Sequence, residues 1–276
     1  MPGAQRTRFV QREDVQMNRI SFSAAAVLAL LVSGAVPARP AESGVLTVFA
    51  AASLHDAFTD IAAKFEAAHP GVTVRLNFDG SQILETQIEN GAPADVFASA
   101  DARSMAKATS AGLVGTPVDF AHNSLVVIAQ FDVNVRSLRD LTRDGLKLAM
   151  CAEQAPCGRY TRIALQKMSA DKSYWRDYGD QVMRNVATQE QNVEGVVQKV
   201  LLGEADAGFV YSSDVVQKGV KLLNYPIPDA DQELATYPIA VVKASAYPSL
   251  AREFLEFVIS AQGRTVLESY GFRSPS

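Results

Sequence analysis

A β-rich run that ends in small residues and passes directly into an amphipathic helix is the feature that most constrains this chain. Residues 46–54 read Leu-Thr-Val-Phe-Ala-Ala-Ala-Ser-Leu, and apolar residues then recur at helical spacing until Pro70-Gly71. We expect Ser53 to cap this helix, where unpaired N–H groups and the positive end of the helix dipole favour an anion. A serine that only caps its own helix gives the same pattern, so this junction alone assigns no function.

The N-terminus has the features of a secretory signal. Residues 22–36 carry no charge, follow Arg19, and end in a small-residue cleavage pattern at 36–38. The run is too short to cross a bilayer comfortably. We expect residues 1–38 to be a signal peptide, with Met17 as a second candidate for the start of translation. No cysteine lies near the predicted cleavage site, which argues against a lipid-anchored precursor.

The charge of the exported chain limits its partners. The 276-residue sequence has a formal net charge of −4. The predicted signal peptide contains four arginines and two acidic residues, so its removal leaves a charge of about −6. An acidic protein is a poor match for nucleic acid or an anionic membrane, because both require a basic surface.

Two cysteines, Cys151 and Cys157, lie six residues apart. In an exported protein this spacing favours a loop disulfide, which on the chain-entropy model stabilises by about 2 kcal/mol and mainly shapes the loop. The three histidines are scattered, so no cluster with metal-ligand spacing is predicted. A thioredoxin-like redox pair would have two intervening residues rather than five.

The mature length of about 238 residues suits two modest α/β domains. The order of strand, serine and helix recurs at 72–88, where Asp79-Gly80-Ser81-Gln82 follows an alternating strand. Further patterns predict strands at 94–98, 125–129, 146–150, 207–211 and 237–242, and helices at 101–111, after 158, and at 193–202, 248–259 and 262–270. This alternation favours parallel strands covered by helices.

Five segments taken together closely resemble the periplasmic molybdate-binding proteins of ABC transporters. They are Thr-Val-Phe-Ala-Ala-Ala-Ser-Leu at 47–54, Gly-Ala-Pro-Ala-Asp-Val-Phe at 91–97, Asn-Ser-Leu-Val-Val at 123–127, Gly-Phe-Val-Tyr-Ser-Ser-Asp at 208–214 and Tyr-Gly-Phe at 270–272. The resemblance implies a type II periplasmic-binding-protein fold, an α/β architecture in which two lobes with central mixed sheets enclose a ligand cleft. It implies a discontinuous first lobe (45–121 plus 239–276), a second lobe (122–238), and crossing strands near Asn123 and Tyr237.

The same resemblance implies the site. The matching positions are Ser53 and Ser81, each with a hydroxyl and a backbone N–H, Cys157 and Val193 with backbone N–H groups at helix starts, and Tyr211 with its phenol. Molybdate or tungstate would be held through these residues, with no direct metal-ion ligand and no cofactor. The implied protein is a periplasmic monomer that delivers the oxyanion to an inner-membrane ABC permease. Donors without acceptors suit an unprotonated dianion and leave the proton of hydrogen phosphate unpaired.

Two positions depart from the family pattern. Asp79 precedes Gly80 and Ser81, where the family usually has a small neutral run. We expect Asp79 to face outward and support the helix start, with Gln82 in a capping-box arrangement. A carboxylate facing inward would repel a dianion or accept a phosphate proton, so phosphate and sulfate remain alternative ligands. Cys157 stands where small residues such as alanine also occur, but only its backbone N–H is needed.

Other classes of function fit the sequence less well. An esterase using Ser53 would need a Gly-x-Ser-x-Gly elbow and a histidine base, whereas His55 is expected to face solvent. A transcription regulator would need a helix-turn-helix before residue 45, where the signal peptide is predicted. We therefore expect a binding protein and not an enzyme.

Overall fold

Two five-stranded sheets organise the part of the chain that the computed structural model describes, residues 44–217 and 221–275. The predicted signal peptide lies outside the described residues. The first sheet has the order β2-β1-β3-β10-β4 and the second β7-β6-β8-β5-β9. The strands of the first sheet are β1 (Gly44–Ala51), β2 (Val72–Asp79), β3 (Val96–Ala98), β4 (Val118–Asn123) and β10 (Ala235–Val241). Those of the second are β5 (Leu125–Ala129), β6 (Leu148–Cys151), β7 (Val186–Glu190), β8 (Ala207–Tyr211) and β9 (Leu223–Pro226).

Both sheets are mixed rather than purely parallel. β1 pairs in parallel with β2 and β3, whereas β10 runs antiparallel to β3 and β4. In the second sheet β6 is parallel to β7 and β8, and β5 is antiparallel to β8 and β9. The expectation of parallel strands from the alternation alone was wrong for β10 and β5, because each enters its sheet from the other one. The mixed sheets implied by the family resemblance are confirmed.

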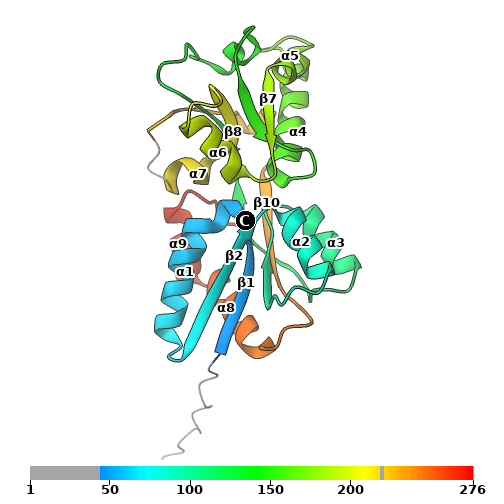
Figure 1. Ribbon diagram of the computed structural model, residues 1–276, viewed down its shortest axis with the longest axis vertical. Coiled ribbons are helices and arrows are strands. Elements are labelled where there is room, and N and C mark those ends of the chain that lie inside the picture. Colours follow the sequence, from blue (N-terminus) through cyan, green and yellow to red (C-terminus); the bar gives the residue numbers. More distant parts are fainter. Residues whose placement is uncertain (1–43, 218–220, 276) are drawn as a thin grey trace, which may run out of the picture. The chain divides into compact units, whose positions relative to one another are not determined.

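The chain crosses between the sheets twice. Ser124 alone separates β4 of the first sheet from β5 of the second, and the return runs from β9 to β10. Elements from both ends of the described chain therefore lie together, as the blue, cyan, orange and red elements do in Figure 1. The exact boundaries of the two lobes stay a prediction.

Helices cover both sheets. Those associated with the first sheet are α1 (His55–Ala68), α2 (Ser81–Glu89), α3 (Ala102–Ser110), α8 (Pro248–Ile259) and α9 (Ala261–Ser269). The second sheet carries η2 (Leu138–Thr142), α4 (Pro156–Ala170), α5 (Tyr178–Arg184), α6 (Val193–Leu201) and α7 (Ser212–Gln217), and short 3₁₀ turns occur at η1 (Ala52–Leu54) and η3 (Asp229–Asp231). Phe58 and Phe65 on the apolar face of α1 pack edge-on against Phe254 of α8, with ring centroids 6.2 and 5.2 Å apart. Helix α8, near the C-terminus, thus packs into the same core as α1, near the start of the described chain.

The periodicity located the long amphipathic helices and the edge strand β2, but it missed the other three edge strands. No pattern in the sequence predicted β4, β7, β9 or α5, and β6 begins two residues later than expected. The missed strands β4, β7 and β9 are shorter than β2 and carry mixed side chains, so their alternation is weak. Within the described residues no helix is long and apolar enough to cross a membrane.

Candidate functional site

All five predicted site residues line one cavity between the two sheets. We call the side contributed by the first sheet the first wall, and it consists of Ala51, Ala52, Ser53, Asp79, Gly80, Ser81 and Ala100. The second wall, contributed by elements of the second sheet, consists of Pro156, Cys157, Asn192, Val193 and Tyr211. The structure therefore brings together residues that are up to 158 positions apart in the sequence. Their binding of an oxyanion stays a prediction.

Ser53 lies inside the 3₁₀ turn η1 between β1 and α1, and its predicted role as the cap of α1 was wrong. The N-cap of α1 is Leu54, and no side chain caps the helix. The extra turn moves the helix start two residues beyond Ser53. The Ser53 hydroxyl is buried and lies 2.9 Å from the hydroxyl of Tyr237 on β10. A side chain from the returning strand therefore fixes the orientation of Ser53 at the cavity.

Ser81 is the first residue of α2 and is fully buried. Its Oγ accepts a hydrogen bond from the backbone N–H of Ala100 at 2.9 Å. Because the oxygen accepts this bond, the hydroxyl proton can be donated elsewhere. Gly80, the N-cap, lies close to the backbone before α6, since a Cβ there would lie 2.7 Å from the carbonyl oxygen of Gln191. Any larger residue at position 80 would therefore require a shift of the backbone at Gly80 or Gln191.

Cys157 and Val193 lie at helix starts, as predicted. Cys157 is the second residue of α4, and Val193 is the first residue of α6. N–H groups in a first turn have no partner within their helix, and the helix dipole there is positive. Asn192 caps α6, with its Oδ1 accepting from the Gly195 N–H at 3.1 Å. Both helix starts can therefore direct backbone donors at an anion.

The predicted disulfide between Cys151 and Cys157 is present, with a Cα–Cα distance of 5.7 Å. It joins the end of β6 to the first turn of α4. Gly158 allows this close approach, because a Cβ there would lie 2.0 Å from the carbonyl oxygen of Ala152. The bond and the glycine thus hold the end of β6 close to the first turn of α4.

Tyr211, the last residue of β8, contributes a buried hydroxyl. Only 1% of the residue is exposed, and its hydroxyl has no hydrogen-bond partner among the described residues. Burial raises the pKa of Tyr211 well above its ordinary value, so the phenol keeps its proton. A buried hydroxyl without a partner is costly. The geometry thus leaves a neutral donor at the cavity with its hydrogen-bonding capacity unused by the protein.

Asp79 binds across the cavity and does not form the predicted capping box with Gln82. Its Oδ1 accepts from the Gly80 N–H at 2.7 Å and from Asn192 Nδ2 at 2.8 Å. Gln82 donates instead to the carbonyl oxygen of Gln191 at 2.8 Å. The capping box was wrong because Gly80, not Asp79, is the N-cap of α2. The Asp79 side chain therefore faces the second wall.

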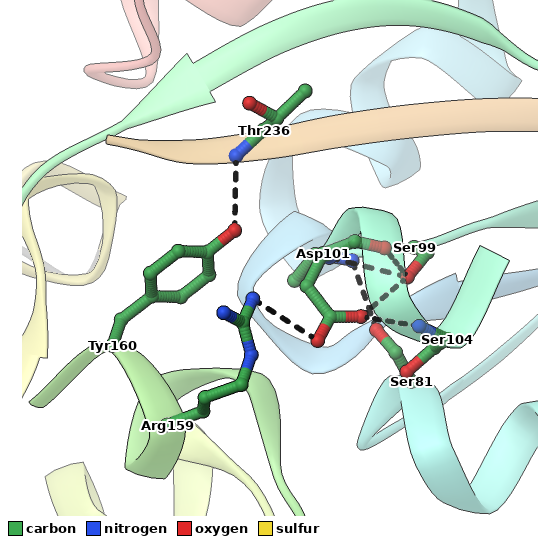
Figure 2. Close-up of polar contacts among 8 residues, drawn as sticks. Ser81, Ser99, Asp101, Ser104, Arg159, Tyr160 and Thr236 are labelled. Atoms are coloured by element: carbon green, nitrogen blue, oxygen red, sulfur yellow. Dashed lines mark hydrogen bonds and ion pairs between the residues drawn. The ribbon is translucent and has the colours of Figure 1, made fainter. Parts of the chain in front are cut away.

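An ion pair also joins elements of the two sheets (Figure 2). Arg159 Nη2 on α4 lies 3.4 Å from Asp101 Oδ2, and the Asp101 side chain is only 3% exposed. Asp101 also caps α3, because its Oδ1 accepts from the Ser104 N–H at 2.9 Å. Asp101, Arg159 and Asn192 were not predicted from the sequence as residues of this region. The helix-capping pattern could have indicated Asp101, but nothing near Arg159 in the sequence points to a partner 58 residues away.

Comparisons with known proteins give consistent matches. Residues 46–273 match the family model described as bacterial extracellular solute-binding protein. The molybdate-binding protein ModA of Mycobacterium tuberculosis is 39% identical over 94% of this chain and 100% of its own length. ModA of Escherichia coli is 35% identical over 92% of this chain and 97% of its own length. The solved structure of the Azotobacter vinelandii periplasmic molybdate-binding protein aligns with a TM-score of 0.73 at 21% identity, covering 84% of this chain and 100% of that one.

Proposed function

The chain belongs to the family of bacterial extracellular solute-binding proteins, and from this premise we propose that its solute is molybdate, with tungstate as a second ligand. The proposed protein acts in the periplasm and delivers the oxyanion to an ABC permease of the inner membrane. Two relatives at 39% and 35% identity carry the name molybdate-binding protein, which supports the choice of solute. The observation that carries the proposal is the buried, unpartnered Tyr211 hydroxyl in a cavity that two serines and two helix starts also line.

Such a cavity suits a fully deprotonated tetrahedral dianion. Removing a dianion from water is costly, and many hydrogen bonds from neutral groups can compensate without a counter-charge. Ser53, Ser81 and Tyr211 offer hydroxyls, and the turns at Cys157 and Val193 offer backbone N–H groups. Asp79 adds an acceptor at the edge, but its Oδ1 already receives two hydrogen bonds from the protein. These two hydrogen bonds orient the carboxylate toward Asn192 of the second wall.

The proposed mechanism is capture by closure of the two walls. A solute that receives hydrogen bonds from both walls stabilises their close approach, because it binds the closed arrangement better than the open one. The permease then recognises the closed form. The proposal needs no covalent step, and the described residues contain no group of three or more side chains that could hold a metal ion.

Isothermal calorimetry of the exported protein tests this proposal directly. Molybdate, tungstate, sulfate and phosphate are titrated separately into the protein lacking the predicted signal peptide. We expect one-to-one binding of molybdate and tungstate, and binding of sulfate and phosphate that is at least about a hundredfold weaker. A difference of this size corresponds to hydrogen bonds to a charged group that are lost or left unmatched. Tighter binding of sulfate or phosphate would overturn the proposed solute.

A further inference from the structure

The hydrogen bond between Asp79 and Asn192 joins the two walls without using the solute. Asp79 is the last residue of β2 and lines the cavity. One of its oxygens receives both the Gly80 N–H and the Asn192 amide, at 2.7 and 2.8 Å. Two donors on one oxygen restrict the rotation of the carboxylate. The negative charge of Asp79 disfavours a bound anion, but the same carboxylate accepts a hydrogen bond from Asn192 of the second wall.

Asn192 transmits this contact to the start of α6. Its Nδ2 donates to Asp79 while its Oδ1 accepts from the Gly195 N–H at 3.1 Å, so the amide is bonded at both ends. An amide bonded through both groups has one orientation. Val193 follows immediately and is a proposed source of a backbone N–H for the solute. The position of that donor therefore depends on the contact with Asp79.

We propose that Asp79 is a positioning residue for the anion site: its carboxylate holds the cap of α6, through Asn192, against the first wall and does not contact the solute. This inference rests on the proposed function. A chain with a carboxylate at this position can keep an anion site because the carboxylate has two opposing effects. It repels the anion, but it also makes the hydrogen bond that joins the two walls.

A pair of substitutions separates these two effects. Asp79→Asn and Asp79→Ala both remove the charge, but only asparagine keeps an oxygen that can accept from Asn192. We expect molybdate to bind Asp79→Ala about tenfold more weakly than Asp79→Asn, the order of one hydrogen bond, with the difference appearing in the dissociation rate. Equal affinities would overturn the proposal. Asp60→Asn on the surface of α1 removes the same charge away from the cavity and serves as the control.

Exchange of the two side chains tests the contact itself. Asn192→Asp alone places two carboxylates opposite each other, and we expect it to weaken molybdate binding by about tenfold or more. The double variant Asp79→Asn with Asn192→Asp restores one donor and one acceptor and keeps an oxygen to cap α6. It should bind within about threefold of wild type. Losses that simply add in the double variant would show that the residues act independently, and would overturn the proposal.

Hydrogen–deuterium exchange of the ligand-free protein supplies a measurement that does not depend on the solute. We expect amides in the first turn of α6 to exchange faster in Asp79→Ala than in Asp79→Asn or wild type, because the cap loses its anchor. Unchanged exchange would overturn the positioning role. If wild type fails to bind molybdate while the exchange differs as expected, the proposed function falls and the positioning role of Asp79 stands.

Discussion

The two walls of the cavity present their donors in different ways. The first wall uses serine hydroxyls that other parts of the protein already hold, since Ser53 contacts Tyr237 and Ser81 accepts from Ala100. The second wall uses helix starts and the hydroxyl of Tyr211, which has no partner within the described chain. Side-chain identity should therefore matter for folding and binding in the first wall. At the two helix starts of the second wall the placement of the backbone should matter more than the residue type, whereas Tyr211 acts through its hydroxyl.

The largest expected effect is that of Ser81→Ala in the first wall. The change removes a donor to the proposed anion and leaves the buried Ala100 N–H without its acceptor. We expect the binding free energy of molybdate to weaken by about 3 kcal/mol, at the upper end for a hydrogen bond to a charged group, and the free energy of unfolding to fall by about 1–2 kcal/mol. Calorimetry and urea unfolding measure the two quantities. Wild-type affinity in this variant would remove Ser81 from the proposed site.

Ser53→Ala should weaken molybdate binding by about 1–3 kcal/mol, because one hydroxyl donor is lost while the backbone N–H remains. The turn at Ser53 loses its contact with Tyr237, so a small decrease in stability should accompany the change. The same titration measures the affinity. Thr59→Ala on the exposed face of α1 is a control for the loss of a hydroxyl, since Thr59 bonds only locally to the carbonyl oxygen of His55.

Tyr211→Phe should weaken molybdate binding without lowering the free energy of unfolding, in contrast to the serine substitutions of the first wall. The hydroxyl makes no hydrogen bond within the described protein, so its removal should leave the free energy of unfolding of the ligand-free protein unchanged or raise it. Molybdate binding should weaken by about 1–2 kcal/mol. Tyr225→Phe is the matched control, because the Tyr225 hydroxyl bonds to the carbonyl oxygen of Val135, away from the cavity. Unchanged affinity in Tyr211→Phe would contradict its proposed role.

Replacing both cysteines by alanine tests whether backbone placement governs the second wall. Loss of the Cys151–Cys157 bond should lower the free energy of unfolding by about 2 kcal/mol on the chain-entropy model. The Cys157 N–H is still present, so we expect molybdate binding to weaken by less than about 1 kcal/mol, a cost of loop ordering. Thermal unfolding and calorimetry measure these changes. A loss of binding as large as that of Ser81→Ala would mean that the bond itself, rather than the helix start, positions the donor.

The smallest effect concerns pH. Burial raises the pKa of Tyr211 well above 10, so the folded protein keeps this proton while the unfolded chain loses it near pH 10. The contribution to stability is therefore complete below about pH 10 and decreases as the pH rises above it. Molybdate affinity should stay constant between about pH 7 and 9.5 as far as this phenol is concerned. A decrease with a midpoint in that range, absent from Tyr211→Phe, would contradict the assignment.

What the sequence could predict follows the same division between side chains and backbone. The repeated order of strand, serine and helix pointed to Ser53 and Ser81 from residue types alone. Cys157 and Val193 could be indicated only by the family resemblance, because any residue can supply a backbone N–H. Asn192 directly precedes a predicted helix, so its capping role was open to prediction, but its contact with Asp79, 113 positions away, leaves no local pattern.

For the fold, the sequence predicted the long amphipathic helices but not every short element. Periodicity found the amphipathic helices, among them α1 and α6, whose apolar faces repeat over several turns. It gave no signal for β7, a half-exposed strand at a sheet edge, or for the seven-residue helix α5. The capping roles given to Ser53 and Asp79 were wrong because helix starts shift by one or two residues when a 3₁₀ turn or a glycine precedes them.

The pair of Arg159 and Asp101 has a consequence for release of the cargo. Separating the walls exposes a carboxylate that is almost fully buried and removes the cation beside it. Part of the resistance to opening is therefore the same whichever oxyanion is inside, and salt screens it less than an exposed pair. In the proposed function the permease would supply that work through its own contacts with the separated surfaces. The lifetime of the loaded protein would then depend in part on two side chains that do not line the cavity.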